Sequence, residues 1–207
     1  MERLANREKA GAILAKALRD YRGRDDVLVL ALPRGGVPVG YVIAKELGAE
    51  LDVMVVRKLG FPGQPELAMG AIASGGTTVL NPSIAAVVPS SEIEAVAVRE
   101  LAELERREKA YRGGRPPAEI AGRCIILVDD GLATGATMRA AIAAVRPAQP
   151  KEVVVAVPVA PPSTVATLSR EADRVVCPNQ PTPFLAIGPW YQDFRQVSDR
   201  EVVSLLE

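Results

Sequence analysis

The stretch that decides the fold reads Ile125-Ile126-Leu127-Val128-Asp129-Asp130-Gly131-Leu132-Ala133-Thr134-Gly135-Ala136-Thr137. Its apolar, β-branched beginning is typical of a strand buried in a parallel sheet. Two carboxylates end this strand, and a loop of small residues then leads into a helix. Such a loop exposes several backbone N–H groups toward one point, where the helix dipole also favours an anion. We therefore expect a phosphate site on Ala133, Thr134, Gly135, Ala136 and Thr137.

The two acids that precede this loop indicate what accompanies the phosphate. Asp129 and Asp130 would repel a phosphate directly, so they suit sugar hydroxyls or a metal ion instead. A phosphate beside a diol describes ribose 5-phosphate. The loop is not a Walker A loop, because no Gly-Lys-Ser/Thr follows, and it lacks the Gly-x-Gly-x-x-Gly dinucleotide pattern. The alternative is a plain strand-to-helix turn in which Asp130 is a cap.

Strands and helices alternate on both sides of this stretch. Buried-strand runs occupy 27–32, 51–56, 124–129, 153–159 and 174–177, and helical patterns occupy 7–21, 37–47, 91–111, 134–145 and 162–170. Ser91 with Glu94, and Ser198 with Glu201, have the spacing of a helix-capping box. The alternation predicts an α/β fold with a doubly wound, mostly parallel five-stranded sheet and flanking helices.

Two basic segments follow the first two strands. Arg34, Gly35 and Gly36 lie between a strand and a helix, where the glycines free backbone N–H groups and the arginine offers a fork for phosphate oxygens. Arg57 and Lys58 end the second strand. A segment rich in glycine and proline follows, which we expect to be a mobile loop or a loop plus hairpin, with Ser74–Gly76 as a turn.

The C-terminal tail concentrates aromatic side chains. Four of the eight aromatic residues of the chain lie between positions 183 and 194. A planar aromatic ligand would need such a stacking face. The alternative is a small aromatic core that holds the C-terminus in place.

The whole pattern resembles the type I phosphoribosyltransferases, whose phosphoribosyl-pyrophosphate (PRPP) motif is a hydrophobic strand, two acids and a Thr-Gly-x-Thr loop. The resemblance implies that residues 133–137, here called the phosphate loop, hold the 5-phosphate. It implies that residues 32–38, the pyrophosphate loop, hold pyrophosphate together with Arg57 and Lys58. The acids would face the ribose and a magnesium ion, directly or through water. In relatives acting on 6-oxopurines, the position of Ala133 is often an acid that serves the base, which this chain lacks.

The resemblance also assigns domains and the acceptor site. Residues 1–177 would be the PRPP-binding core, with a flexible closing loop at 59–80 and a helical insert at 90–112, and residues 178–207 the C-terminal hood and tail. In the hood, Phe184 would stack on the base, and Asp193 would meet its edge. The implied base-binding residues are Phe184, Leu185, Trp190, Tyr191 and Asp193.

Composition excludes several other classes. The chain has 207 residues, equal numbers of acidic and basic side chains, and no histidine. The zero net charge argues against non-specific nucleic-acid binding, and the missing histidine excludes Ser-His-Asp catalysis and His-containing metal sites. Cys124 and Cys177 are too few for a disulfide scaffold. The charged start and the absence of a 20-residue apolar run indicate neither a signal peptide nor a membrane span, so we expect a cytoplasmic protein.

The expected function is transfer of ribose 5-phosphate from PRPP to a purine-like nitrogenous base, with release of pyrophosphate. The partners would be PRPP, the base and magnesium, and the family also suggests a homodimer. The alternative is a PRPP- or nucleotide-sensing regulator of the same fold with little catalytic activity.

Overall fold

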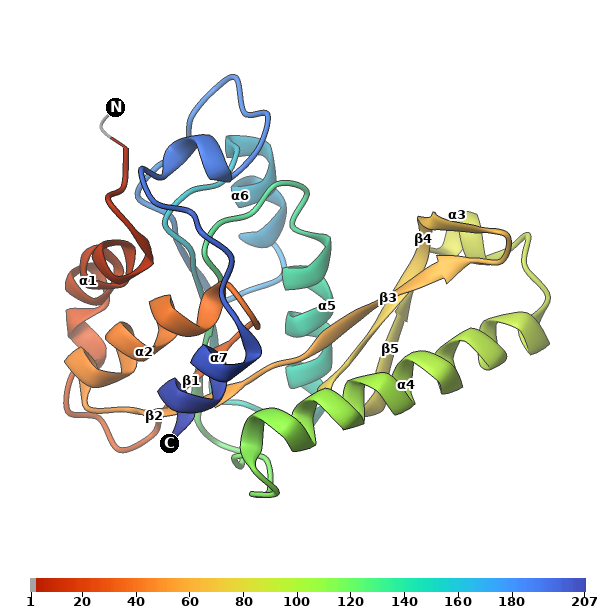
Figure 1. Ribbon diagram of the computed structural model, residues 1–207, viewed down its shortest axis with the longest axis horizontal. Helices are drawn as coiled ribbons and strands as arrows, with labels where there is room; N and C mark the ends of the chain where they lie inside the picture. Colours follow the sequence, from red (N-terminus) through yellow and green to blue (C-terminus); the bar gives the residue numbers. More distant parts are fainter. Residues whose placement is uncertain (1–2) are drawn as a thin grey trace.

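The computed structural model describes residues 3–207, with the backbone alone described at 65–66. Figure 1 shows a body built around a parallel sheet and a long arm that extends from one side of it. The arm comprises β3 (Val56–Phe61), β4 (Gln64–Ala73), β5 (Thr77–Leu80), α3 (Pro82–Ala85) and α4 (Ser90–Arg112).

The sheet of the body has five parallel strands. In spatial order they are β2 (Glu50–Val53), β1 (Val27–Ala31), β6 (Cys124–Val128), β7 (Glu152–Ala156) and β8 (Arg174–Val176). Burial of every residue of β1 and β6 explains their continuous apolar runs. The predicted five-stranded parallel sheet is confirmed.

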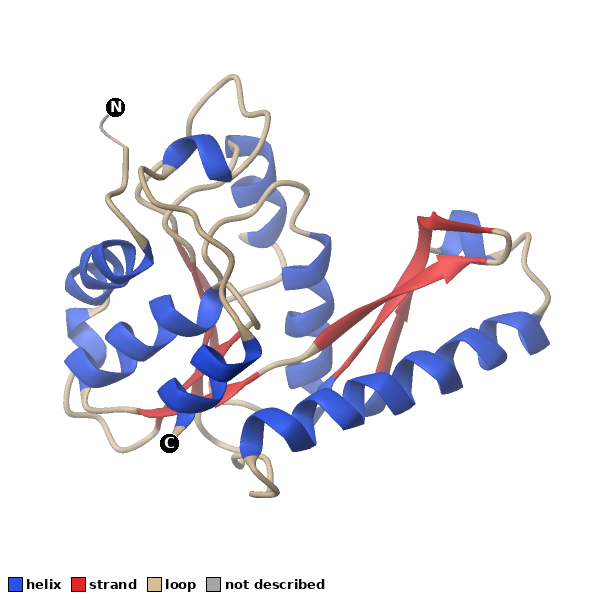
Figure 2. Cartoon of the chain, in the orientation of Figure 1, coloured by secondary structure: helices blue, strands red, loops and turns tan. Residues whose placement is uncertain are grey.

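Helices cover both faces of this sheet (Figure 2), as a doubly wound fold requires. Side chains of β1 and β6 alternate between two cores. Val29 and Ile126 face α1 (Arg7–Ala17) and α2 (Gly36–Leu47). Leu28 and Ile125 face the other side, with α5 (Ala136–Val145) and α6 (Pro162–Leu168).

The strand order reverses between β1 and β6. The chain leaves β1 through α2 and returns to the sheet as β2, but it leaves β6 through α5 and returns on the opposite flank as β7. The two connections therefore diverge at neighbouring strand ends. Parallel sheets bind ligands at such a switch point, outside the carboxyl ends of the strands.

The arm is where the sequence prediction was least complete. The segment predicted as a loop or loop plus hairpin folds as an antiparallel sheet in the order β3-β4-β5, and its expected turn is the 3₁₀ turn Ser74–Gly76. Against this sheet, α4 buries Val96 and Leu104. The predicted capping box at Ser91 is wrong, because α4 begins at Ser90, after Pro89, with no side-chain cap.

Both terminal segments pack on the body, where the N-terminal segment pairs with the hood. The capping box of Ser198 and Glu201 is confirmed at the start of α7 (Asp199–Leu206). Leu4 pairs with the hood, since its N–H donates to the carbonyl of Trp190 and its carbonyl accepts from the N–H of Gln192, at 2.9 and 2.8 Å. In the described part of the chain, no helix has the length and apolar character to cross a membrane.

Candidate functional site

The phosphate loop is open to solvent at the start of α5. Gly135 precedes the helix with φ 75°, a conformation that favours glycine, and no side chain caps the helix there. Ala133, Thr134, Ala136 and Thr137 are exposed. The loop is held from behind, because the Thr164 hydroxyl donates to the Ala133 carbonyl at 2.6 Å. Its backbone N–H groups are therefore available to an anion.

The pyrophosphate loop packs directly against the end of β6. The Leu32 N–H donates to the Val128 carbonyl at 2.8 Å. A Cβ on Gly36 would lie 2.6 Å from that same carbonyl oxygen, and one on Gly35 would lie 2.0 Å from Oδ2 of Asp130. A side chain at either position would collide with the end of β6, so both positions require glycine. The pyrophosphate loop therefore lies against the strand end from which the chain continues to the phosphate loop.

The second acid, Asp130, lies buried beneath the pyrophosphate loop. Its Oδ2 accepts from Nε of Arg7 at 2.8 Å and forms an ion pair with the same guanidinium, also at 2.8 Å. Its backbone carbonyl accepts from the Tyr191 hydroxyl at 2.6 Å. Burial raises the pKa of Asp130, whereas Arg7 acts in the opposite direction. Asp130 therefore joins α1, the pyrophosphate loop and the hood.

The first acid, Asp129, is only half buried as a residue. Its Oδ1 accepts from the backbone N–H of Asp130 at 2.8 Å. Burial of the carboxyl group, with the neighbouring charge of Asp130, raises the pKa of Asp129 well above its usual range. A carboxyl group with a raised pKa at a sheet switch point is a typical feature of a functional site.

Arg34 is exposed on the pyrophosphate loop. Its guanidinium lies 3.9 Å from Oδ1 of Asp199 at the start of α7. The same oxygen accepts from the Tyr111 hydroxyl at 2.7 Å, so the arm, the pyrophosphate loop and the C-terminal helix meet at Asp199. Through Asp199, α7 therefore contacts both the pyrophosphate loop and the arm.

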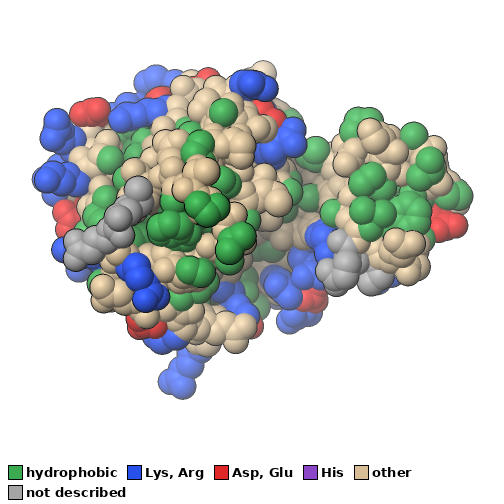
Figure 3. All heavy atoms as spheres, turned by 90° about the horizontal axis from the view of Figure 1, so that it is seen from above, with side chains coloured by type: hydrophobic (Ala, Val, Ile, Leu, Met, Phe, Trp, Pro, Cys, Tyr) green, Lys and Arg blue, Asp and Glu red, His purple; other side chains and the backbone are tan. Residues whose placement is uncertain are grey.

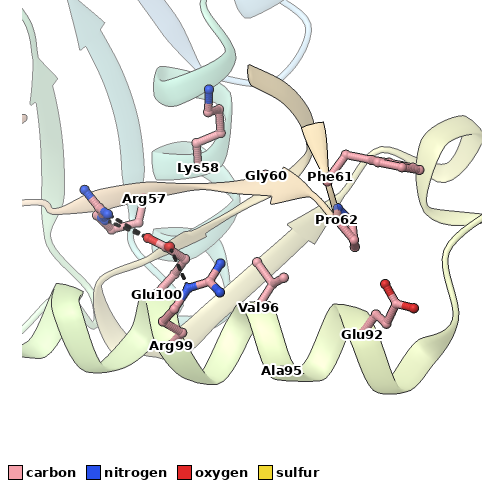
Figure 4. A pocket seen from close by; sticks show the side chains of 11 residues that line it. Arg57, Lys58, Gly60, Phe61, Pro62, Glu92, Ala95, Val96, Arg99 and Glu100 are labelled. Carbon is pink, nitrogen blue, oxygen red and sulfur yellow. Dashed lines mark hydrogen bonds and ion pairs between the residues drawn. The ribbon is translucent and has the colours of Figure 1, made fainter. Parts of the chain in front are cut away.

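The other two predicted pyrophosphate residues point to opposite sides of β3, as Figure 4 shows. Arg57 turns toward α4, where its guanidinium donates to Oε2 of Glu100 at 2.7 and 3.0 Å. It lines a cavity of about 610 Å³ between β3 and α4. The side chain of Lys58 points toward α5, and Lys58 shares a second cavity, of about 620 Å³, with Ala136 and Thr137. Alternation along a strand causes this separation.

The predicted base-binding residues divide between the surface and the interior. Phe184 is half buried and stacks on Trp190, with ring centroids 6.3 Å apart. Leu185 is 92% exposed. Tyr191 is buried with Leu4 and Ala10, and the exposed Asp193 accepts from the Arg195 N–H at 3.1 Å. The interpretation as a small aromatic core thus holds for Tyr191, and the role of Phe184 and Leu185 in stacking on a base stays a prediction.

In the described part of the chain, three side chains that sequence reasoning did not select form the ion pairs given above with predicted site residues: Arg7, Glu100 and Asp199. Arg7 lies 123 positions from Asp130 along the chain, and each of the three sits on a helix whose pattern is otherwise ordinary. The local signal that could have indicated Arg7 is an arginine in the first turn of α1, at a position that the helical pattern places on the buried face.

The residues fit magnesium only in part. In the described part of the chain, no three His, Cys, Asp or Glu side chains come together as a metal site. Asp130 is already paired with Arg7, which leaves Asp129 as the carboxylate of the pair with room for another partner. Magnesium is usually bound by one or two carboxylates together with substrate phosphates and water, and Asp129 suits that arrangement.

Comparison with known proteins identifies the family. The model of the phosphoribosyl transferase domain matches residues 2–193. The chain belongs to this family. The resemblance to type I phosphoribosyltransferases inferred from the motifs is thereby confirmed.

Individual relatives agree with this assignment. A protein of Mycobacterium tuberculosis named "Putative phosphoribosyl transferase" is 46% identical over 209 residues; the match covers 100% of this chain and 47% of the relative. The chain thus spans about half the length of the curated relatives that it matches.

Solved structures show the same fold. The crystal structure of TT1426 from Thermus thermophilus is 46% identical, with a TM-score of 0.87, and the match covers 99% of this chain and 97% of that one. The AQ2163 protein of Aquifex aeolicus, at 12% identity and a TM-score of 0.53, shares the fold over 84% of this chain and 72% of its own.

Proposed function

We propose that this chain is a phosphoribosyltransferase that binds PRPP and transfers its ribose 5-phosphate to a nitrogenous base of purine type. One observation carries the proposal: a glycine loop follows each of the neighbouring strands β1 and β6 at the switch point, the first loop packs on the end of β6, and Asp129 lies at that strand end. PRPP is a ribose with phosphate at one end and pyrophosphate at the other. Two anion-binding loops flanking a carboxylate match that distribution of charge.

The reaction requires positioning and electrostatics rather than an amino-acid nucleophile. The bond between C1 of the ribose and the pyrophosphate oxygen breaks, and a bond from C1 to a nitrogen of the base forms. The pyrophosphate loop would hold the leaving group, the phosphate loop would hold the 5-phosphate, and Asp129 would hold the ribose hydroxyls. Magnesium, when bound with the substrate, would neutralise charge on the pyrophosphate.

The arm and the hood would complete the site. Residues 59–80 would close over the ribose and exclude water, which otherwise intercepts the sugar cation. Phe184 would stack on the base, with Trp190 behind it and Asp193 at the base edge. The hollow between body and arm in Figure 3 is the space that such a closure would reduce.

The test is pyrophosphate release from PRPP, with magnesium, across a panel of purine and pyrimidine bases. We expect release with at least one purine-type base and loss of release in Asp129→Asn. Tight PRPP binding without release for any base would contradict the enzyme assignment.

That outcome would favour the second candidate, a PRPP- or nucleotide-sensing regulator. Two observations support it. Arg34 and Arg57 already lie near Asp199 and Glu100, at 3.9 and 2.7 Å, and Ala133 offers no acid to the base. If the protein binds neither PRPP nor a nucleotide, both candidates fail.

A further inference from the structure

The contacts of Arg7 single it out within the site. Its guanidinium makes two contacts with Oδ2 of Asp130, and its third nitrogen donates to the Arg195 carbonyl at 2.7 Å. The same group lies 4.2 Å from the centroid of the Phe194 ring. The Arg7 and Asp130 side chains are 10% and 11% exposed, so this is a buried ion pair rather than a surface one.

The position of Asp130 gives this pair a functional consequence. The Oδ2 atom that Arg7 contacts also packs against Gly35 of the pyrophosphate loop, since it would lie 2.0 Å from a Cβ placed on that glycine. If Asp130 were an uncompensated anion, it would lie directly beneath the backbone groups expected to hold pyrophosphate. Like charges at such short range repel strongly in a partly desolvated site.

We propose that Arg7 is a positioning residue: it neutralises Asp130, fixes it beneath the pyrophosphate loop, and leaves Asp129 as the acid of the pair that meets PRPP. This inference rests on the proposed function. Arg7 does not touch the ligand in this arrangement, and it acts through the charge and place of Asp130. Asp129 and Asp130 thus have different roles, although the sequence shows two identical side chains.

The experiment measures PRPP affinity by calorimetry, with magnesium and at constant ionic strength, in the whole chain. The variants are Arg7→Met, Asp130→Asn, the double variant and Asp129→Asn, with Lys9→Met as a matched control on the exposed side of α1. Fluorescence of Trp190, the only tryptophan of the chain, reports whether the hood remains folded.

We expect Arg7→Met to weaken PRPP binding by about 10–100-fold, the size of effect seen for residues that orient ligand groups indirectly. Adding Asp130→Asn to it should restore affinity by about tenfold, because the uncompensated charge is then removed. Asp130→Asn alone should weaken binding less than Asp129→Asn. Lys9→Met should behave as the wild type.

If Arg7 were merely structural, Arg7→Met would lower the stability of the protein, and adding Asp130→Asn would not restore PRPP affinity. That result would overturn the inference. It would equally be overturned if Asp130→Asn were as damaging as Asp129→Asn, since Asp130 would then meet the ligand. If Arg7→Met does not fold, the neutral double variant and Arg7→Lys replace it, and a loss above about 100-fold in the double variant would contradict the proposal. Absence of PRPP binding in the wild type would instead refute the proposed function.

Discussion

The body and the arm hold their predicted ligand groups in different ways. In the body, the groups are backbone N–H donors and carboxylates at the ends of buried parallel strands, and glycine contacts leave no room for adjustment. In the arm, the groups are cationic side chains on a partly exposed strand, and Arg57 is held by an ion pair with α4. The body thus places its groups through backbone contacts, whereas the place of Arg57 in the arm depends on an ion pair with another element.

The largest expected effect comes from breaking the joint between the two regions. Arg112, at the end of α4, donates to both carboxylate oxygens of Asp52 at 2.9 and 3.1 Å and to the Val53 carbonyl at 3.0 Å. Arg112→Met would leave Asp52 buried without a counter-charge, and removal of one partner of a buried pair costs about 3–5 kcal/mol. Urea unfolding should show this loss.

The control for the joint is Arg106→Met, which removes an exposed ion pair with Glu103 from the same helix. Exposed pairs contribute little, so its unfolding midpoint should move far less. Equal losses of unfolding free energy in the two variants would mean that the Arg112 pair does not stabilise the joint between the arm and the body.

A second prediction separates the two cations of the arm. Lys58 faces the cavity shared with the phosphate loop, whereas Arg57 is held on the other side by Glu100. If the arm closes over PRPP, Lys58→Gln should lose a charge-assisted contact worth about 1.5–3 kcal/mol, or roughly 10–100-fold in affinity. Arg57→Gln should lower PRPP affinity by about threefold or less.

Titration calorimetry with PRPP and magnesium distinguishes these cations. A larger loss in Arg57→Gln would show that Arg57 leaves Glu100 when the ligand binds. Glu100→Gln then serves as the follow-up, because it should increase PRPP affinity only if the pair with Glu100 competes with the ligand.

The parts of the fold that the sequence could predict are those encoded by local pattern. The apolar runs of β1 and β6, the glycine loops after them, and the cap at Ser198 each depend on a few adjacent residues, and the structure has them. Strand ends were overestimated, since the predicted strand 153–159 ends at Ala156 as a regular strand, and only an isolated bridge between Val159 and Asn179 continues the pairing beyond it.

The partners of the site residues could not be predicted in this way. The contacts of Asp130 with Arg7 and Tyr191 span 123 and 61 positions, and they depend on where α1 and the hood dock. The opposite directions of Arg57 and Lys58 follow from alternation, but only after β3 is known to be a strand between α4 and α5. The arm was harder to predict because glycine and proline signal loops, although here they lie within hairpin strands.

The third prediction concerns the hood, on the body side of the comparison. Phe184→Ala should remove a stacking face worth about 1–3 kcal/mol, and so weaken base affinity roughly 5- to 150-fold with little change in PRPP affinity. Leu185→Ala, at an exposed neighbour, should change base affinity by less than about twofold. Unfolding of Phe184→Ala would identify the aromatic tail as a structural core instead.

The smallest expected effect is a gain in stability when Asp129, the acid at the end of β6, is replaced by asparagine. The pKa of Asp129 is raised in the folded state, so the folded protein binds this proton more tightly than the unfolded chain does. The stabilising contribution of that proton is complete below the unfolded value of 3.8 and is lost as pH rises through the folded pKa. At neutral pH, above the unfolded pKa, this carboxyl group beside Asp130 therefore lowers the stability of the fold. Asp129→Asn should increase the free energy of unfolding by about 0.5–2 kcal/mol at pH 7 while abolishing PRPP binding.

The difference between Asp129→Asn and the wild type should also shrink as pH falls toward 4, because the wild-type carboxyl group then takes up its proton. Chemical unfolding at a series of pH values measures this directly. Asp193→Asn, at an exposed carboxylate of the hood, should keep the wild-type pH dependence. If Asp129→Asn destabilises the protein at pH 7, the ionised Asp129 must have a stabilising partner, and the assignment of a strained, ligand-facing acid at the end of β6 is wrong. If Asp129→Asn stabilises the protein, the wild-type acid at the switch point lowers the stability of the fold. This is expected of a group whose favourable partner is a bound ligand.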